Sequence, residues 1–342
     1  MRYLPLLVFM ACDGKPADDD TSDDTDSNLE GDTDTDADTD ADSDADSDAD
    51  TDADTDTDTG ADPVLTGIAL TSVIPDPMTT RDVARFIVMA EYDDGSELDV
   101  TELASWTSSD EAVLRFYDPG VGQPLWSGAV NVTASYETFV GPEVAVAVTM
   151  ATATAGDLVF NEVLSDGLVD GDPNQDGSLE SEEDEFVEIA NASDVTVDLS
   201  GVTFLEENFA YLPRHTFAEG TILRAGEAIV VFGGGDVSTL TGTNVTFVVA
   251  ENEDPGLQYG LCMLDSGETI QLVGADGVAI TTFTYGDATT PAINDASYVL
   301  DPEVWGTAWT HHYYAADSIG YYSPGTLVDG SAFPGADARY TN

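Results

Sequence analysis

The residues whose spacing is best suited to chemistry lie at 170–185, in the stretch DGDPNQDGSLESEEDE. It matches the calcium-loop pattern D-x-[DN]-x-[DN]-G-x5-E at every specified position. In such a loop, alternate side-chain oxygens surround one side of a hard cation, and the glycine, here Gly177, permits the sharp turn. A late glutamate closes the shell with both of its oxygens. The predicted calcium ligands are Asp172, Asn174, Asp176, Ser178 through its carbonyl, Glu180 through a water molecule, and Glu183.

The surroundings of this loop leave its last ligand open. Strands, rather than the two helices of an EF-hand, are expected on both sides, so Asp184 or Glu185 could replace Glu183. Residues 170–185 hold eight carboxylates and no base, and these repel one another when no cation lies between them. We therefore expect calcium to stabilise the domain and not to serve catalysis. An acidic turn without an ion is the alternative.

The sequence lacks the common catalytic signatures. Neither H-E-x-x-H nor G-x-S-x-G occurs, and the single lysine, Lys15, does not belong to a phosphate-binding loop. His311 and His312 are expected in a partly buried aromatic neighbourhood, and Cys262 is expected as a buried apolar residue. We predict that the protein is not an enzyme; a metal-dependent hydrolase that uses Asp172 is the alternative.

Aromatic side chains near the C-terminus could bind a ligand in another way. Exposed rings there would stack on sugars, whereas buried rings would cover the open end of a β-sandwich. The residues of this possible ligand platform are Trp305, Trp309, Tyr313 and Tyr314.

Short apolar or alternating runs, separated by turn residues, predict an all-β fold of two Ig-like β-sandwiches. In the first, over 63–152, runs such as ARFIVMAEY and AVNVTASY are separated by turns that contain Gly or Pro. The stretch AEYDDGSELDVTELASWTSSDEAVLRF resembles bacterial Ig-like domains of group 2 in the order of its segments. The resemblance implies a spacer or adhesin module, with Trp106 as a core aromatic.

The second domain, over 155–335, has the acidic loop between its first two strands. LVFNEVL is followed by DEFVEIANASDVTVDLSGVTF, LPRHTFAEGTILRAGEAIVVFGGG, GETIQLVGADGVAITTFTYGDA and SYVLDPEVWGTAW. These segments resemble a lamin tail domain, an Ig-like sandwich of nuclear lamins and of exported bacterial proteins. The resemblance implies a scaffolding role outside the cell without a defined activity.

The charge of the chain limits its partners. Its 342 residues include 68 Asp and Glu against 8 Lys and Arg, a net charge of −60. Residues 13–62 hold 23 of these acids, and 63–342 hold the other 45 with six arginines, so both parts are acidic. Because affinity for nucleic acids comes from Lys and Arg that displace counterions, DNA and RNA are excluded as partners.

The N-terminal segment, MRYLPLLVFMAC at 1–12, has the features of a short secretory signal. Ala11 before Cys12 resembles the lipobox of bacterial lipoproteins, in which the cysteine is acylated. The expected lipidation site is therefore Cys12, with the protein at the cell envelope or surface and in contact with the membrane through its lipid anchor only. A plain secretory signal, with full secretion, is the alternative.

A low-complexity region follows this segment. From Asp32 to Asp58 every even-numbered residue is Asp, so a strand with this pattern would have no apolar face. We expect 13–62 to be a disordered acidic linker that lifts the domains off a membrane. Weak collective binding of divalent cations is the alternative.

These features predict a non-catalytic lipoprotein of the cell envelope that acts as a structural or interaction module, with calcium stabilising its lamin-tail-like domain. A carbohydrate-binding or adhesin-type surface module is the alternative. The expected partner is a protein or a glycan at the surface.

Overall fold

The computed structural model describes residues 62–165, 171–207, 211–251, 260–292 and 296–336. These ranges contain 23 strands, one four-residue helix, α1 (Ser181–Asp184), and two 3-10 helices at Val237–Thr239 and His312–Tyr314, which confirms the all-β prediction. Residues 61–342 belong to one compact unit. Cys12, the signal and the acidic linker up to residue 61 lie outside the described residues. No helix in the described ranges is long and apolar enough to cross a membrane.

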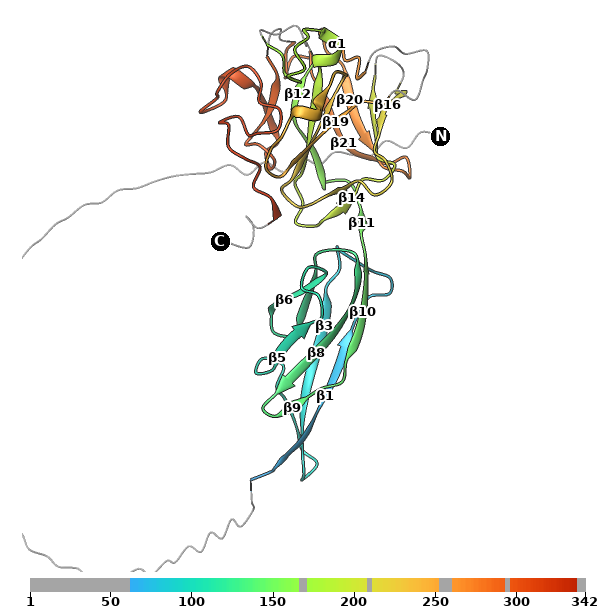
Figure 1. Cartoon of the computed structure of the whole chain (residues 1–342), viewed down its shortest axis with the longest axis vertical. Helices are drawn as coiled ribbons and strands as arrows, with labels where there is room; N and C mark the ends of the chain where they lie inside the picture. The colour runs from blue at the N-terminus through green and yellow to red at the C-terminus, as the bar shows by residue number, and fades with distance from the viewer. Residues whose placement is uncertain (1–61, 166–170, 208–210, 252–259, 293–295, 337–342) are drawn as a thin grey trace, which may run out of the picture. The chain divides into compact units, whose positions relative to one another are not determined.

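Two five-stranded sheets face each other in the first sandwich (Figure 1). Its strands are β1 (Leu65–Val73), β2 (Met78–Thr79), β3 (Ala84–Tyr92), β4 (Glu97–Asp99), β5 (Ser105–Ser108), β6 (Leu114–Asp118), β7 (Val121–Pro124), β8 (Gly128–Tyr136), β9 (Phe139–Val140) and β10 (Val144–Thr149). One sheet has the order β1-β3-β7-β6, with β4 paired to β3. The other has the order β2-β10-β8-β5, with β9 paired to β8.

The first sandwich follows the alternation of its sequence. In β3, Ala84, Phe86, Val88 and Ala90 are buried, and the residues between them are more exposed, because successive side chains of a strand point to opposite faces. Phe86 also lies against Trp106, with ring centroids 5.8 Å apart, so this tryptophan packs against the core as expected.

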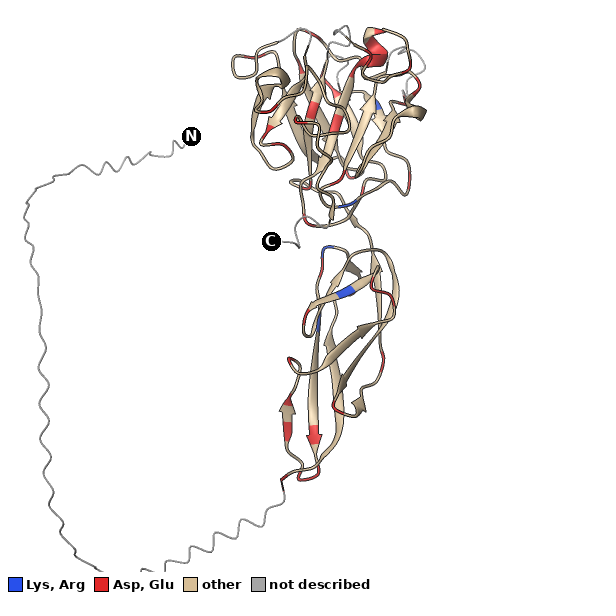
Figure 2. Cartoon of the chain, turned by 60° about the vertical axis from the view of Figure 1, so that its left-hand side comes forward, with Lys and Arg blue, Asp and Glu red and all other residues tan. Residues whose placement is uncertain are grey.

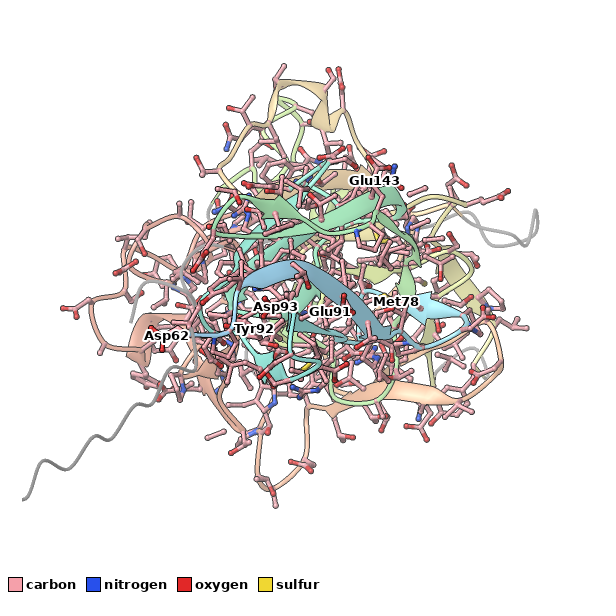
Figure 3. The ribbon with its side chains drawn as sticks, turned by 90° about the horizontal axis from the view of Figure 1, so that it is seen from below. Asp62, Met78, Glu91, Tyr92, Asp93 and Glu143 are labelled. Carbon is pink, nitrogen blue, oxygen red and sulfur yellow. The ribbon has the colours of Figure 1, made fainter. Side chains whose placement is uncertain are left out.

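The chain enters this sandwich at an acidic end, seen from below in Figure 3, where Asp62, Glu91 and Asp93 are labelled. Val64 N donates a hydrogen bond to Asp93 Oδ1 at 2.9 Å, and Asp93 N donates to the Val64 carbonyl at 3.0 Å. This pair fixes the start of β1 next to the end of β3.

Three sheets build the second sandwich. Its strands are β11 (Ala151–Thr152), β12 (Leu158–Leu164), β13 (Phe186–Asn191), β14 (Val197–Asp198), β15 (Thr203–Glu206), β16 (Pro213–Thr216), β17 (Ile222–Leu223), β18 (Ala228–Phe232), β19 (Val245–Val249), β20 (Thr269–Val273), β21 (Ala279–Thr284), β22 (Tyr298–Asp301) and β23 (Ala308–His311). Their orders are β19-β18-β13-β12-β22-β23, β16-β15-β20-β21 and β11-β14-β17. Because β11 pairs with β14, Ala151 and Thr152 belong to the second sandwich, and not to the first as the sequence suggested.

The six-stranded sheet is covered on both faces. Every residue of β13 and β18 is buried. One face packs against the four-stranded sheet, through contacts such as Phe160 against Phe204 with ring centroids 6.1 Å apart. The other face is covered by the C-terminal segment, which contributes Val304, Leu327 and Phe333 to a cluster with Ala190. Strands buried on both faces explain the nearly continuous apolar run AIVVF.

Polar contacts join the two sandwiches. Both terminal nitrogens of Arg81 donate to the carboxylate of Asp157, at 3.0 and 2.8 Å. Thr80 Oγ1 donates to the Thr196 carbonyl at 2.7 Å. The short connection between β10 and β11 leaves a single residue, Met150, between the last strand of one sandwich and the first of the next.

Candidate metal centre

The acidic loop lies between β12 and β13, at one end of the six-stranded sheet (Figure 1). Its turn depends on two residues with positive φ, Gln175 at 58° and Gly177 at 90°. Glycine adopts that conformation without a steric penalty, which is why the pattern calls for it at this position. Residues 166–170, just before the loop, are outside the described residues, and Asp170 is among them.

The first three predicted ligands wrap the same turn. Asp172 accepts hydrogen bonds from Gly177 N at 2.7 Å and from Asp176 N at 3.2 Å. Asn174 Oδ1 also accepts from Asp176 N, at 3.0 Å, and Asp176 Oδ1 accepts from Ser178 N at 2.7 Å. The main chain therefore holds the oxygens of Asp172, Asn174 and Asp176 around one turn, in the order that the sequence predicted.

Asp184 is the carboxylate that closes this turn. It is fully buried, its Oδ2 accepts from Glu180 N at 3.0 Å, and its Oδ1 has no hydrogen-bond partner among the described residues. The pKa of Asp184 is raised to about 6, chiefly by burial and with a smaller contribution from the nearby charges of Asp172 and Asp176. A buried carboxylate oxygen without a donor is costly unless a cation satisfies it.

The neighbouring acids are less suited to this role. Glu183 and Glu180 are exposed, and the contacts of Glu183 with the loop are made by its main chain: its N donates to the Glu180 carbonyl at 2.9 Å, and its carbonyl accepts from Asn174 Nδ2 at 3.4 Å. Glu185 is buried but faces elsewhere, since its Oε2 accepts from Met263 N at 3.1 Å. Of the three alternatives for the last ligand, the geometry thus favours Asp184.

Three glycines bring the connection after β18 beneath the loop. A Cβ on Gly235 would lie 2.6 Å from Asp176 Oδ2, and one on Gly234 would lie 2.8 Å from the side chain of Glu183. Asp236 N also donates to Asp176 Oδ2 at 3.3 Å. Only a run without side chains can pass this close, so Gly233, Gly234 and Gly235 support the loop from below.

The donor set fits a hard cation that accepts mixed oxygen ligands. Among the described residues, no three His, Cys, Asp or Glu side chains gather around one point as a metal centre of such groups would require. The loop instead offers two kinds of oxygen on one turn, the carboxylates of Asp172 and Asp176 and the amide of Asn174, with the carboxylate of Asp184 nearby. Calcium binds such mixtures, with carbonyl and water oxygens completing the shell.

Residues 151–287 match the family model of the Lamin Tail Domain. This part of the chain is a lamin tail domain. The matched range starts at β11 and ends before β22. Strands β22 and β23 of the six-stranded sheet, and the C-terminal segment that covers this sheet, therefore lie beyond the match.

A curated relative is Ice-binding protein 1 of Shewanella frigidimarina (strain NCIMB 400), 34% identical over 73 residues. That stretch is 21% of this chain and only 8% of the relative. Domains 5-6 of the S-layer protein SbsC align at a TM-score of 0.20 and 15% identity, over 65% of this chain and 96% of that one. The Yersinia pseudotuberculosis adhesin InvE aligns at 0.26 and 10% identity, over 72% and 64%. Scores this low carry no argument about function.

Buried carboxyl groups on β12 and β13 accept hydrogen bonds from the C-terminal segment that covers the six-stranded sheet. Glu162 accepts from Ser323 N at 2.9 Å, and Glu188 accepts from Gly325 N at 2.7 Å and from Asn161 Nδ2 at 2.8 Å. Burial raises the pKa of Glu162 to about 7 and the pKa of Glu188 well above its usual range, and the charge of Glu162 adds to the shift at Glu188.

A serine and a histidine meet next to these acids. Ser323 Oγ lies 2.9 Å from His312 Nε2 and 3.0 Å from Glu162 Oε2. The carboxylate therefore bonds the serine and not the histidine, which differs from the order of a hydrolase triad. Because all three residues are also buried, this cluster is best explained as structural.

The residues of the predicted aromatic platform differ in their exposure and in their contacts. Trp309 stacks on Phe283, with ring centroids 3.7 Å apart, and packs against the core of the lamin tail domain. Trp305 is 49% exposed, in the turn between β22 and β23. The ring centroids of Tyr313 and Tyr314 are 4.2 Å apart, and both side chains are exposed. Tyr321 is also exposed, and its ring centroid lies 6.1 Å from that of Tyr313. The exposed cluster therefore consists of Tyr313, Tyr314 and Tyr321.

The remaining singled-out residues agree in part with expectation. His312 is buried and His311 half-buried, and burial lowers the pKa of both. Cys262 is a free thiol that is half-buried rather than fully buried, and burial raises its pKa. Sequence reasoning missed the support of the loop by Gly233–Gly235, although three consecutive glycines directly after an apolar strand were a visible signal.

Proposed function

We propose that this protein is a non-catalytic surface module whose lamin tail domain is stabilised by calcium in the loop at 172–184. The observation that carries the calcium proposal is Oδ1 of Asp184, which is buried without a donor next to Asp172 and Asp176. A cation there would neutralise a cluster that otherwise repels itself, and thus bind the folded state only.

The surface location is part of the same proposal. It is supported by the resemblance of the N-terminal segment to a lipoprotein signal, with Cys12 as the acylated residue, and by a net charge of −60 that favours cationic partners and divalent ions. The name of the relative refers to ice binding, but the matched stretch is only 8% of that protein, so ice binding is not part of this proposal. The first sandwich would then act as a spacer.

Thermal melting of the full chain, with calcium and with EGTA, tests the calcium site. We expect calcium to raise the Tm, because ligand at a hundredfold excess over its Kd adds about 2.7 kcal/mol to the stability of the folded state. Asp184→Asn should melt at or above the wild-type temperature in EGTA, since it removes one repelling charge, and should lose the response to calcium.

Glu183→Gln is the matched control for this experiment. It removes a neighbouring carboxylate of the same loop that is exposed, so the response to calcium should persist. A wild-type Tm that is the same in calcium and EGTA would sink the proposal. A loss of the response in Glu183→Gln but not in Asp184→Asn would instead restore Glu183 as the last ligand.

A second candidate function is a carbohydrate-binding surface, favoured by the exposed cluster of Tyr313, Tyr314 and Tyr321. On a glycan array, Tyr314→Ala should abolish binding because this ring is the most exposed of the three, at 69%. Tyr211→Ala, which removes an exposed ring just before β16, is the control and should keep the signal. Equal signals from both variants and the wild type would contradict the proposal.

A further inference from the structure

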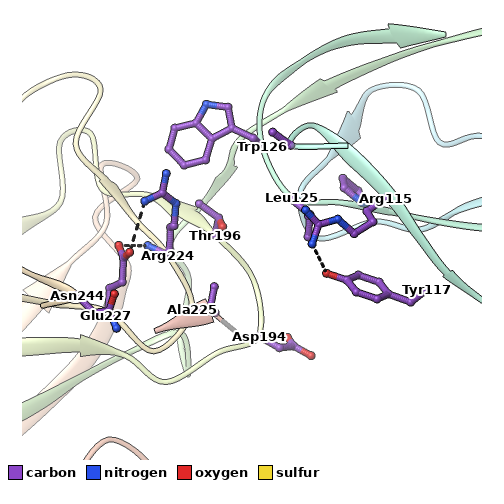
Figure 4. A pocket seen from close by; sticks show the side chains of 13 residues that line it. Arg115, Tyr117, Leu125, Trp126, Asp194, Thr196, Arg224, Ala225, Glu227 and Asn244 are labelled. Atoms are coloured by element: carbon purple, nitrogen blue, oxygen red, sulfur yellow. Dashed lines mark hydrogen bonds and ion pairs between the residues drawn. The ribbon is translucent and has the colours of Figure 1, made fainter. Parts of the chain in front are cut away.

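Two of the few arginines of this acidic chain line one cleft. A cavity of about 550 Å³ lies where the first sandwich meets the lamin tail domain, a volume typical of sites for small ligands (Figure 4). Arg115 and Tyr117 of β6 and Trp126 line one side, and Arg224 and Glu227 line the other. Arg115 and Arg224 are 109 positions apart in the sequence, so only the fold brings them to the same cleft.

Arg115 lines this cleft, and one of its hydrogen-bond donors is unsatisfied. Its Nε is buried and has no partner among the described residues. Its Nη1 donates to the Tyr117 hydroxyl over a long 3.4 Å, and the guanidinium lies 5.9 Å from the centre of the Tyr117 ring. A guanidinium held beside an aromatic ring can donate paired hydrogen bonds from its other nitrogens to a carboxylate.

Arg224 is positioned in a similar way across the cleft. Its guanidinium lies 4.8 Å from the centre of the Trp126 ring, a cation–π contact. Its ion pair with Glu227 is long, at 3.5 Å, and its side chain is 53% exposed. A long, exposed pair of this kind contributes little, so most of the guanidinium's donors remain available to a ligand.

The chemistry of the lining selects among anions. Two guanidinium groups offer paired donors to a carboxylate, and Trp126 and Tyr117 offer aromatic surface to a ring. Asp194 and Glu227 also line the cleft, where they would accept hydrogen bonds from hydroxyl groups and repel a doubly charged phosphate. We propose that this cleft binds a saccharide that carries a carboxylate, such as a uronic acid unit of an acidic polysaccharide.

Calorimetric titration of the full chain with trigalacturonic acid tests this proposal, with the trimethyl ester of the same sugar as the neutral control. Both runs contain EGTA, because uronates bind calcium themselves. We expect the acid to bind about tenfold or more tightly than the ester, the size of effect given by one charge-assisted hydrogen bond. Binding of the acid should also weaken as the salt concentration rises.

Arg115→Gln should weaken binding of the acid about tenfold, because it removes the charge and keeps much of the side chain. Arg85→Gln is the matched control, since Arg85 lies on β3 of the same sandwich and outside the lining of this cleft. Equal affinity for acid and ester, no binding of either sugar, or equal losses in the two arginine variants would each overturn the proposal.

Discussion

Of the described residues that are buried in the first sandwich, only Thr80 and Ser108 are polar, whereas the lamin tail domain buries seven carboxyl groups. These are Asp157, Glu162, Asp184, Glu185, Glu188, Glu206 and Glu268. None of the described acids of the first sandwich is buried, so its interior consists mainly of apolar contacts. Figure 2 shows acidic residues in both sandwiches, and their burial, not their number, distinguishes the two.

This difference means that the two sandwiches respond to different conditions. Apolar burial does not depend on the proton or cation concentration, whereas a buried carboxyl group couples the folding free energy to both. Solution conditions should therefore change the stability of the lamin tail domain and leave that of the first sandwich nearly constant.

The largest expected effect comes from core truncation, which shows whether the sandwiches unfold separately. Phe160→Ala should destabilise the lamin tail domain by about 3–5 kcal/mol, because the side chain is 1% exposed and its removal leaves a cavity. Phe86→Ala is the matched change in the first sandwich, at 2% exposure. Hydrogen exchange with mass spectrometry should show faster exchange only in the truncated sandwich; faster exchange in both would mean that they unfold as one unit.

A smaller effect should come from pH, in the absence of calcium. The pKa of Glu162 is raised to about 7 in the folded state, so its contribution to stability is fully present below its usual pKa near 4.5 and is lost as the pH rises through 7. Glu188 is shifted in the same direction. From pH 5 to pH 8 the lamin tail domain should lose about 3 kcal/mol through Glu162.

Calorimetry across this pH range checks the prediction. Glu162→Gln should flatten the pH dependence, because the amide keeps an acceptor and gains a donor toward the Ser323 hydroxyl. A stability that rises steadily from pH 5 to pH 8 in the wild type would show that the buried carboxyl groups are ionised and paired instead.

The smallest effect concerns the contact between the sandwiches. Arg81→Gln removes a bidentate pair with Asp157, but the arginine is 39% exposed, so the cost should be about 1 kcal/mol or less. Burial opposes the ionised form of Asp157, but the hydrogen bonds from Arg81 and Thr154 outweigh it and lower the pKa of this carboxyl. The difference between the variant and the wild type in calorimetric melts should therefore disappear as the pH falls through the lowered pKa of Asp157.

Local patterns made much of this structure predictable. Alternation placed Phe86 and Val88 in the core, and the regular spacing of Asp172, Asn174 and Asp176 identified the turn that they share. These features depend on residues within a few positions of each other, whose relative geometry the main chain fixes. For the same reason, the lamin tail domain could be recognised from short strand segments.

Features that depend on distant segments could not be predicted. Glu183 fitted the loop pattern, but it is exposed, and Asp184 is buried instead where the distant run Gly233–Gly235 packs against the loop. Trp309 looked free to bind a ligand until β21 brought Phe283 against it. Arg115 and Arg224 had no visible relation in the sequence, because their shared cleft exists only once both sandwiches have folded.

The positions of β1 and β10 determine how the first sandwich would respond to a pulling force. The chain enters the first sandwich at the start of β1 and leaves it at the end of β10, and these strands belong to different sheets. Tension between Leu65 and Thr149 would pull β1 along its own axis, loading all eight of its register pairs with β3 at once. When two strands are sheared along their axes, all of their paired residues resist the force together. When one strand is peeled from its end, the pairs separate one at a time. We therefore expect the first sandwich to resist stretching, and pulling single molecules between residues 62 and 150 would measure the force at which it unfolds.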